Sequence, residues 1–239
     1  MLRAENLSMR YFRKTGNANH FHAVKGVSLE LRPGEVALLT GRSGSGKTTL
    51  LHMLAGLLTP TEGKVWLDDT DLYALPDGAL SRLRNAKFGV IPQGRSAVDT
   101  LTVLENVLLP QQLRGEKGDA EGAFRWLDAL GIAGLRDARP AELSGGELRR
   151  MAIARALAEN PEILFADEPT GDLDDENTTA VLTLLRKSAV EDGKAVLLVT
   201  HDSEALPYGD RIYRMESGSL RVDDSAAAND RRGDPRKNA

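Results

Sequence analysis

Residues 41–48 constrain the chain most, because they join an apolar run to a helical pattern through a glycine-rich turn. They read Gly-Arg-Ser-Gly-Ser-Gly-Lys-Thr and match the phosphate-binding pattern G-x-x-x-x-G-K-[ST] without a mismatch. Residues 35–40 before them are typical of a buried strand, and residues 48–55 after them of a helix. This order places backbone N–H groups and a positive helix-dipole end at one point. It predicts binding of a nucleoside triphosphate together with magnesium.

The residue types in this loop suit that ligand. The three glycines allow turns that a Cβ would obstruct and let the backbone approach an anion closely. Lys47 is expected to reach the β- and γ-phosphates, and Thr48 to offer its hydroxyl to Mg²⁺. A glycine-rich turn without a ligand is disfavoured, because a lysine and a hydroxyl both stand where the chemistry needs them. The expected nucleotide contacts are Gly41, Arg42, Ser43, Gly44, Ser45, Gly46, Lys47, Thr48 and Thr49.

Composition narrows the class of protein. The 239 residues suffice for one large or two small domains. The 31 basic residues against 35 acidic ones leave a net charge of −4, so nucleic acid is not favoured as a partner. The absence of cysteine is compatible with a reducing cytosol. Because no apolar run approaches the ~20 residues of a membrane span and no signal peptide begins the chain, we expect a soluble protein.

Periodicity along the chain indicates an α/β fold. Alternating apolar and polar residues over 1–32 predict antiparallel strands, and residues 100–138 are mostly helical in pattern. Apolar strands at 163–166 and 195–200, followed by helices at about 175–190 and 203–207, predict a parallel sheet. The polar residues 223–239 show no periodicity, and we expect a disordered tail there.

A second helix start that suits a phosphate follows about a hundred residues after the first. Residues 143–147, Leu-Ser-Gly-Gly-Glu, precede a helix predicted at 148–159. Ser144 is a typical N-cap, and Gly145 and Gly146 expose backbone N–H groups. Since residues 41–48 already surround their own nucleotide, the simplest arrangement is that this loop closes on nucleotide held by another chain. For Ser-Gly-Gly alone, an ordinary capped helix is the preferred interpretation.

An acidic pair and a histidine follow two of the predicted strands. Asp167 ends an apolar run and is expected to hold Mg²⁺ through water, while Glu168 would polarise the attacking water as general base. His201 ends the next strand, at the edge where open α/β sheets gather ligands, and could contact the γ-phosphate. The alternatives are a solvated turn for the pair and a surface position for the histidine. The preceding apolar residues and Pro169 favour catalysis for the pair.

Taken together and in this order, the motifs resemble those of the ATP-binding cassette (ABC) transporter ATPases over residues 1–222. The resemblance implies a P-loop NTPase (RecA-like) core with an antiparallel β-subdomain and an inserted helical subdomain at about 94–142. It also implies that Tyr11 stacks on adenine and that Gln93 reaches Mg²⁺ and the attacking water. Asp174 lies in the string that matches the D-loop of the family. The residues implied to act on the partner chain's ATP are Ser144, Gly145, Gly146 and Glu147.

The strings at 100–107 and 167–174 resemble the lipoprotein-release, macrolide-efflux and antimicrobial-peptide-resistance branch. Three departures stand out: Glu147 in place of the usual glutamine, Gly171-Asp172 in place of Ser-Ala, and a more polar segment 94–99. They put a ribose contact at Glu147 and the shape of the groove for a membrane partner in doubt.

The predicted function is ATP hydrolysis by a homodimer, or by a pair of ABC subunits, that sandwiches two ATP molecules and drives a separate membrane permease. The chain would be cytoplasmic and peripheral on the inner face of the cell membrane. One alternative is an ATPase that regulates a cell-division or cell-wall membrane complex without transport. Another, a nucleic-acid-linked ABC ATPase, is disfavoured by the acidic balance and the lack of long coiled-coil insertions. The sequence leaves substrate, direction and permease open.

Overall fold

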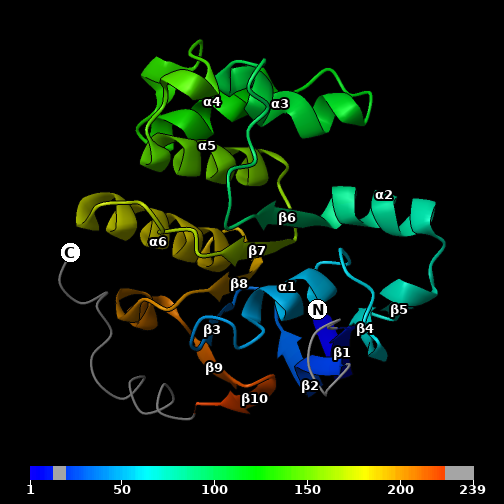
Figure 1. Ribbon diagram of the computed structural model, residues 1–239. Helices are drawn as coiled ribbons and strands as arrows, with labels where there is room; N and C mark the ends of the chain where they lie inside the picture. The colour runs from blue at the N-terminus through cyan, green and yellow to red at the C-terminus, as the bar shows by residue number, and fades with distance from the viewer. Residues whose placement is uncertain (13–19, 224–239) are drawn as a thin grey trace.

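The computed structural model describes residues 1–12 and 20–223, which form two sheets and the helices around them (Figure 1). The smaller sheet is antiparallel, with the order β2-β1-β4-β5. Its strands are β1 (Leu2–Phe12), β2 (His20–Leu31), β4 (Glu62–Leu67) and β5 (Thr70–Asp71). The larger sheet has the order β10-β9-β3-β8-β7-β6. Its strands are β3 (Val36–Thr40), β6 (Phe88–Ile91), β7 (Ile163–Asp167), β8 (Ala195–Val199), β9 (Arg211–Glu216) and β10 (Ser219–Val222).

The helices agree with the predicted ranges apart from two differences. They are α1 (Lys47–Leu54), α2 (Asp77–Lys87), α3 (Val103–Leu113), α4 (Ala120–Ala129), α5 (Gly145–Ala158) and α6 (Asp175–Val190). The helix expected at 148–159 begins earlier, at Gly145, because Ser144 caps it. The helix expected at 203–207 is of the tighter 3₁₀ type. The 3₁₀ helices are η1 (Leu72–Ala74), η2 (Ala133–Leu135), η3 (Pro140–Glu142) and η4 (Ser203–Tyr208).

The predicted parallel sheet is confirmed in β6, β7, β8 and β3, which run in the same direction. Strands β7 and β8 are buried along their whole length, as expected for apolar strands covered on both faces. In the register of the sheet, Asp167 pairs with Val199, and Val199 pairs with Leu39. The carboxyl ends of these strands therefore lie together at one edge.

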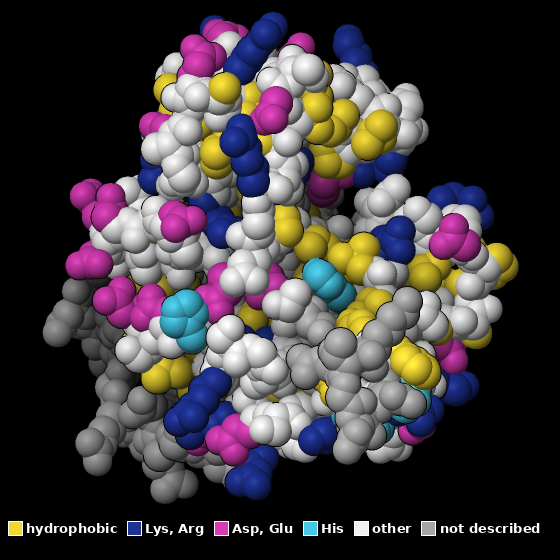
Figure 2. All heavy atoms as spheres, in the orientation of Figure 1, with side chains coloured by type: hydrophobic (Ala, Val, Ile, Leu, Met, Phe, Trp, Pro, Cys, Tyr) yellow, Lys and Arg dark blue, Asp and Glu magenta, His cyan; other side chains and the backbone are white. Residues whose placement is uncertain are grey.

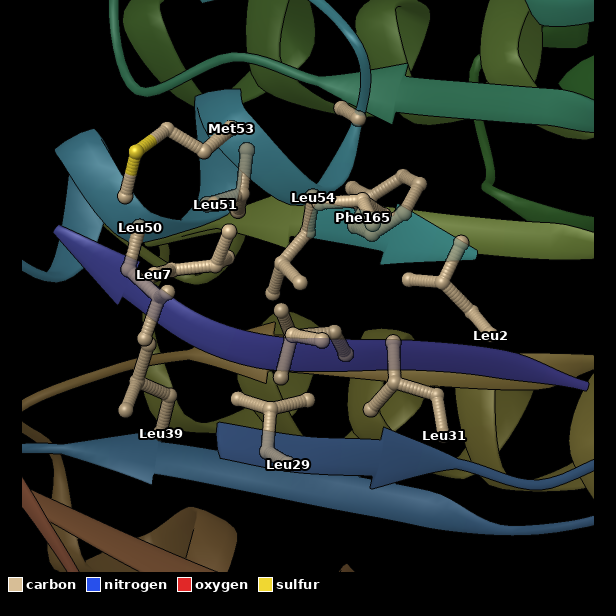
Figure 3. Close-up of a cluster of buried hydrophobic side chains, with 14 of the residues drawn as sticks. Leu2, Leu7, Leu29, Leu31, Leu39, Leu50, Leu51, Met53, Leu54 and Phe165 are labelled. Carbon is tan, nitrogen blue, oxygen red and sulfur yellow. The ribbon is translucent and has the colours of Figure 1, made fainter. Parts of the chain in front are cut away.

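Helix α1 lies between the two sheets and fills the space with side chains (Figure 3). Leu50, Leu51 and Leu54 are completely buried and pack with Leu7 of β1 and Leu39 of β3. Each buried leucine stabilises the fold by about 2 kcal/mol. This packing fixes the helix whose first residue follows the glycine loop.

The other face of the larger sheet is covered by a second apolar cluster, which includes Val107 of α3, Leu127 of α4 and Leu157 of α5. These three helices form a group at the top of Figure 1, and Figure 2 shows a narrower waist below it. Helices α3 and α4 fall within the range predicted for a helical subdomain, about 94–142, and α5 packs against both. The division of residues 1–222 into subdomains stays a prediction.

Two parts of the sequence analysis fall on residues outside this description. The polar residues 13–19, and the tail expected at 223–239 apart from Asp223, lie outside the described residues. Among the residues that are described, no helix combines the length and apolarity needed to cross a membrane.

Candidate nucleotide site

Four parallel strands deliver the predicted site residues to one place. The glycine loop follows β3, Gln93 follows β6, Glu168 follows β7 and His201 follows β8. A cleft of about 810 Å³ opens at these strand ends, a size suited to a small-molecule ligand. The predicted residues that line it are Tyr11, Ser43, Gly44, Ser45, Gly46, Lys47, Thr48, Thr49, Gln93, Asp167, Glu168 and His201. Gly41 and Arg42 line an adjoining hollow that shares Ser43, Gly44 and Ser45 with the cleft.

The loop backbone requires glycine at two positions for steric reasons. Gly46 has φ 107°, and a Cβ there would lie 2.1 Å from the carbonyl oxygen of Ala23 in β2. Gly41 has φ 147°, and a Cβ there would lie 2.3 Å from the carbonyl oxygen of Met215 in β9. Both backbone conformations are unfavourable for a side chain. The loop is therefore held against two strands that are distant in sequence.

The start of α1 is organised to receive an anion. Gly46 is its N-cap residue, and no described side chain caps the helix there. The first N–H groups of a helix have no partner within it, so at this terminus they face the cleft as donors. The Lys47 ammonium donates to the carbonyl oxygens of Gly41 and Arg42 at 2.8 and 3.2 Å. Its positive charge is thereby held inside the curve of the loop.

Asp167, the last residue of β7, carries a buried carboxylate. The residue is 2 % exposed, and neither carboxylate oxygen accepts a well-formed hydrogen bond from a described residue. Burial raises the pKa of Asp167 above its ordinary value, and the side chain of Thr48 lies near enough to oppose this shift. An unpaired buried carboxylate is costly in an isolated chain and is well suited to a cation. The pair of Asp167 and Thr48 therefore fits a divalent metal bound beside the phosphates.

Glu168 has a backbone conformation that is rare for its residue type. Its φ is 51°, in the left-handed region, where a side chain costs roughly 1–3 kcal/mol. Its N–H donates to the carbonyl oxygen of Val199 at 2.9 Å, which fixes this turn to the neighbouring strand. One carboxylate oxygen lies 2.7 Å from Nδ1 of His201, whose side chain is 75 % exposed. The strained turn thus places an acceptor and a titratable ring side by side in the cleft.

Tyr11 contributes an aromatic wall to the same cleft. It pairs with Phe21 across β1 and β2, and the two rings stack with centroids 5.4 Å apart. The sequence analysis did not single out Phe21, although its place opposite Tyr11 follows from the hairpin register. The contact of Tyr11 with adenine stays a prediction.

The predicted signature loop does not line this cleft. Ser144, Gly145 and Gly146 line a separate hollow of about 610 Å³ together with Asp174. The Ser144 hydroxyl accepts a hydrogen bond from the N–H of Glu147, and the Glu147 carboxylate accepts from the Ser144 N–H at 2.7 Å and from its hydroxyl at 2.8 Å. These bonds lower the pKa of Glu147. Asp174 caps α6 by accepting a hydrogen bond from the N–H of Asn177 at 2.8 Å.

Sequence reasoning missed an arginine that contacts the backbone of Gln93. Arg149 of α5 donates to the carbonyl oxygens of Pro92 and Gln93 at 2.6 and 2.5 Å. A signal was present, because Ala152 and Ile153 follow Arg149 at helical spacing on a buried face. A charged residue at such a position needs polar partners.

Comparison with known proteins decides the family. The profile of the ABC transporter family matches residues 24–171, more than half of the chain. The chain belongs to the ABC transporter family. It is an ATPase cassette with the α/β fold of the P-loop NTPases, and its resemblance to the lipoprotein-release branch is confirmed by its relatives.

This ABC cassette is similar over nearly its whole length to curated and solved proteins. The lipoprotein-releasing system ATP-binding protein LolD of Bdellovibrio bacteriovorus is 39 % identical over 219 residues, 91 % of this chain and 98 % of that protein. The uncharacterized ABC transporter ATP-binding protein MJ0796 of Methanocaldococcus jannaschii is 39 % identical over 226 residues, 92 % of this chain and 95 % of that protein. A dimeric structure of MJ0796 matches with a TM-score of 0.87 and 36 % identity, covering 93 % of this chain and 98 % of that one. Another dimeric structure of MJ0796, with the same score and coverage, is a post-hydrolysis state bound to ADP and Pi.

Proposed function

We propose that this cassette hydrolyses Mg²⁺-ATP as a homodimer and thereby drives a membrane permease carried on a separate chain. The observation that carries the proposal is the convergence of four strand ends on one cleft. That cleft combines an uncapped helix start, a lysine and a buried unpaired carboxylate. Phosphoryl transfer requires this combination of anion binding, charge neutralisation and a positioned water.

The roles of the side chains follow from where they lie. The N–H groups at the start of α1 and the Lys47 ammonium bind the phosphates. Asp167 and Thr48 would hold the metal, which would supply positive charge against the charge developing on the phosphate oxygens. Mg²⁺ usually takes one or two carboxylates plus phosphate and water oxygens.

Hydrolysis itself is assigned to the pair at the ends of β7 and β8. Glu168 accepts a proton from the attacking water as general base, and His201, in contact with its carboxylate, orients this acceptor. Gln93, from the end of β6, lines the same cleft and would position the water together with the metal.

Dimerisation is supported by the geometry of the signature loop. Ser144, Gly145 and Gly146 line a hollow of their own outside the cleft, which supports contact with a nucleotide carried by a second chain. The similar cassette MJ0796 is dimeric in its solved structures. We propose the same arrangement here, with each ATP between residues 41–48 of one chain and 144–146 of the other.

A membrane partner is supported by the relatives. LolD of Bdellovibrio bacteriovorus is described as the ATP-binding protein of a lipoprotein-releasing system. We propose that the present chain serves as the corresponding subunit of a membrane complex, on the cytoplasmic face of the membrane. Substrate and direction of transport would be determined by the permease.

The test is Glu168→Gln, which keeps the shape of the side chain and removes its basicity. We expect ATP binding to persist, hydrolysis to fall by about a hundredfold or more, and a dimer to form with ATP present. Dimer formation is measured by light scattering after size exclusion, and hydrolysis is measured by the release of phosphate. The matched control is Glu176→Gln on the exposed start of α6, which should hydrolyse normally. Normal turnover by Glu168→Gln would remove this residue from its assigned role.

A further inference from the structure

Residues 92–96, here called the Gln93 loop, are attached to α5 by two arginines. Arg149 donates to the carbonyl oxygens of Pro92 and Gln93, and Arg155 donates to the backbone and side-chain oxygens of Ser96. Both guanidinium groups are withdrawn from solvent, and burial lowers the pKa of each. Because a desolvated cation makes strong hydrogen bonds to carbonyl oxygens, these contacts are structurally significant.

The surroundings of Arg149 connect it to the hydrolysis site. The residue is 9 % exposed, and a Cβ added to Gly171 would lie 3.7 Å from one of its terminal nitrogens. The negative charges of Asp172, Asp167 and Glu168 all act on the guanidinium. None of the described carboxylates lies within 4.0 Å of it, so its direct partners are the two carbonyl oxygens.

We propose that Arg149 is a positioning residue for ATP hydrolysis, which fixes the backbone from which Gln93 faces the cleft. This inference rests on the proposed function and adds a residue to it. A guanidinium group is a planar fork, and its two terminal nitrogens hold two successive carbonyl oxygens at once. Holding both oxygens fixes the orientation of the two peptide units on either side of the Gln93 Cα, Pro92–Gln93 and Gln93–Gly94.

The position of Arg149 in α5 gives this attachment a further consequence. The same helix begins at the signature loop, with Ser144 as its N-cap five positions earlier in the chain. A helix is stiff over this distance, so a shift of the signature loop moves the anchor of Gln93 with it. Arg149 therefore links the signature loop, which would contact the partner's nucleotide, to the Gln93 loop, which lies beside the nucleotide site of the same chain.

The test compares Arg149→Gln with Arg155→Gln. Each variant removes a guanidinium group of α5 and its two described hydrogen bonds to the Gln93 loop. These bonds reach Pro92 and Gln93 in one case and Ser96 in the other, and Arg149 is buried whereas Arg155 is partly buried. We expect similar losses of Tm. Arg149→Gln should lower kcat by about tenfold with KM unchanged within about twofold, and Arg155→Gln should lower kcat by less than about threefold. Equal losses of kcat in the two variants, or wild-type kcat in Arg149→Gln, would overturn the proposal.

A second measurement does not depend on hydrolysis. Hydrogen exchange of the backbone amides at 93–98, measured without nucleotide, should be faster in Arg149→Gln than in the wild type, and unchanged exchange contradicts the attachment. If the wild type itself fails to hydrolyse ATP, the proposed function fails, while the exchange result still decides whether Arg149 holds the loop. Should Arg149→Gln not fold, Arg149→Lys, which keeps the charge but not the fork, should show reduced kcat at wild-type Tm. Wild-type kcat in that variant would overturn the positioning role.

Discussion

Two helix starts in this chain are built from similar glycine-containing sequences, yet they present their N–H groups differently. At α1 the N-cap is Gly46, in a left-handed conformation and without a described side-chain cap. At α5 the N-cap is Ser144, and Ser144 and Glu147 bond to each other in a capping box. The first helix start is therefore open to a ligand in the single chain, whereas the second is satisfied by its own side chains.

This difference in capping indicates that the two helix starts have different roles in nucleotide binding. An uncapped helix start that is held rigidly binds phosphate without rearrangement. A capped start must exchange internal hydrogen bonds for ligand contacts, so its net gain on binding is smaller. We infer that α1 determines the affinity of one chain for nucleotide, and that α5 contributes chiefly when a second chain presents its nucleotide. Four substitutions test this contrast, in order of decreasing expected effect.

Gly46→Ala should have the largest effect, because it disrupts the open helix start. The added Cβ would meet the Ala23 carbonyl oxygen at 2.1 Å in a backbone conformation unfavourable for alanine. We expect ATP affinity to fall by at least about a hundredfold and Tm to drop, measured by nucleotide titration and thermal melting. Gly193→Ala is the matched control, since it has a positive φ of 68° but open space around the new Cβ. If Gly46→Ala binds ATP like the wild type, the steric argument is wrong.

Asp167→Asn, near Thr48 of α1, should change stability and activity in opposite directions, with stability raised and hydrolysis lost. Burial raises the pKa of Asp167, so the folded chain holds this proton more tightly than the unfolded chain does. The stability cost of ionisation therefore appears as pH rises above the ordinary value of 3.8 and is complete above the raised pKa. We expect the variant without nucleotide to be more stable at pH 7 by on the order of 1 kcal/mol, with Mg²⁺-dependent hydrolysis lost. Urea unfolding at pH 7 and near pH 3 measures the gain, which should vanish at the lower pH; destabilisation at pH 7 would contradict the assignment.

Ser144→Ala tests the capped helix start. Loss of the N-cap should lower stability by about 1 kcal/mol. Nucleotide affinity of the single chain should remain, because Ser144 does not line the cleft of its own chain. In the Glu168→Gln background, ATP-driven dimerisation should weaken by about tenfold, as measured by analytical ultracentrifugation. A loss of ATP binding by the monomer would show that the two helix starts do not act separately.

Glu147→Gln should have the smallest effect. The glutamine amide oxygen still accepts hydrogen bonds from Ser144, but the substitution removes a negative charge near the expected phosphate. Dimerisation should therefore tighten by about twofold. The Ser144 hydrogen bonds lower the pKa of Glu147, so its stabilising contribution is present above the ordinary value of 4.5 and is lost as pH falls through the lowered pKa. Because the residue is only partly buried, the difference in Tm should stay within about 1–2 °C at pH 7 and disappear in acid. Weaker dimerisation at pH 7 would contradict the role of charge.

Local patterns predicted much of this molecule, because they report on short stretches of chain. Apolar runs predicted β3, β7 and β8, and the glycine motif predicted the position of the cleft. The fold class and the membership of the ABC family are confirmed. Serine followed three residues later by glutamate is also a local signal for the capping box at residues 144–147. That signal was available, although the sequence analysis read only the N-cap.

Contacts between distant segments were not predictable from such patterns. The backbones of Ala23 and Met215 pack against the glycine loop from strands that are far apart in sequence. Neither residue type carries a sequence signal for that contact. The attachment of Gln93 to Arg149 spans 56 positions and depends on how α5 packs against β6. The 3₁₀ character of η4 depends on hydrogen-bond spacing that periodicity does not resolve.

The left-handed turn at Glu168 has a consequence for selection experiments. Glycine or asparagine would adopt that turn more comfortably than glutamate does. A mutant library screened for heat tolerance alone should therefore enrich these residues at position 168. The selected proteins should be thermally stable but should no longer hydrolyse ATP. If glutamate is instead retained at this position over many generations, the selection acts on the activity of the protein rather than on its stability.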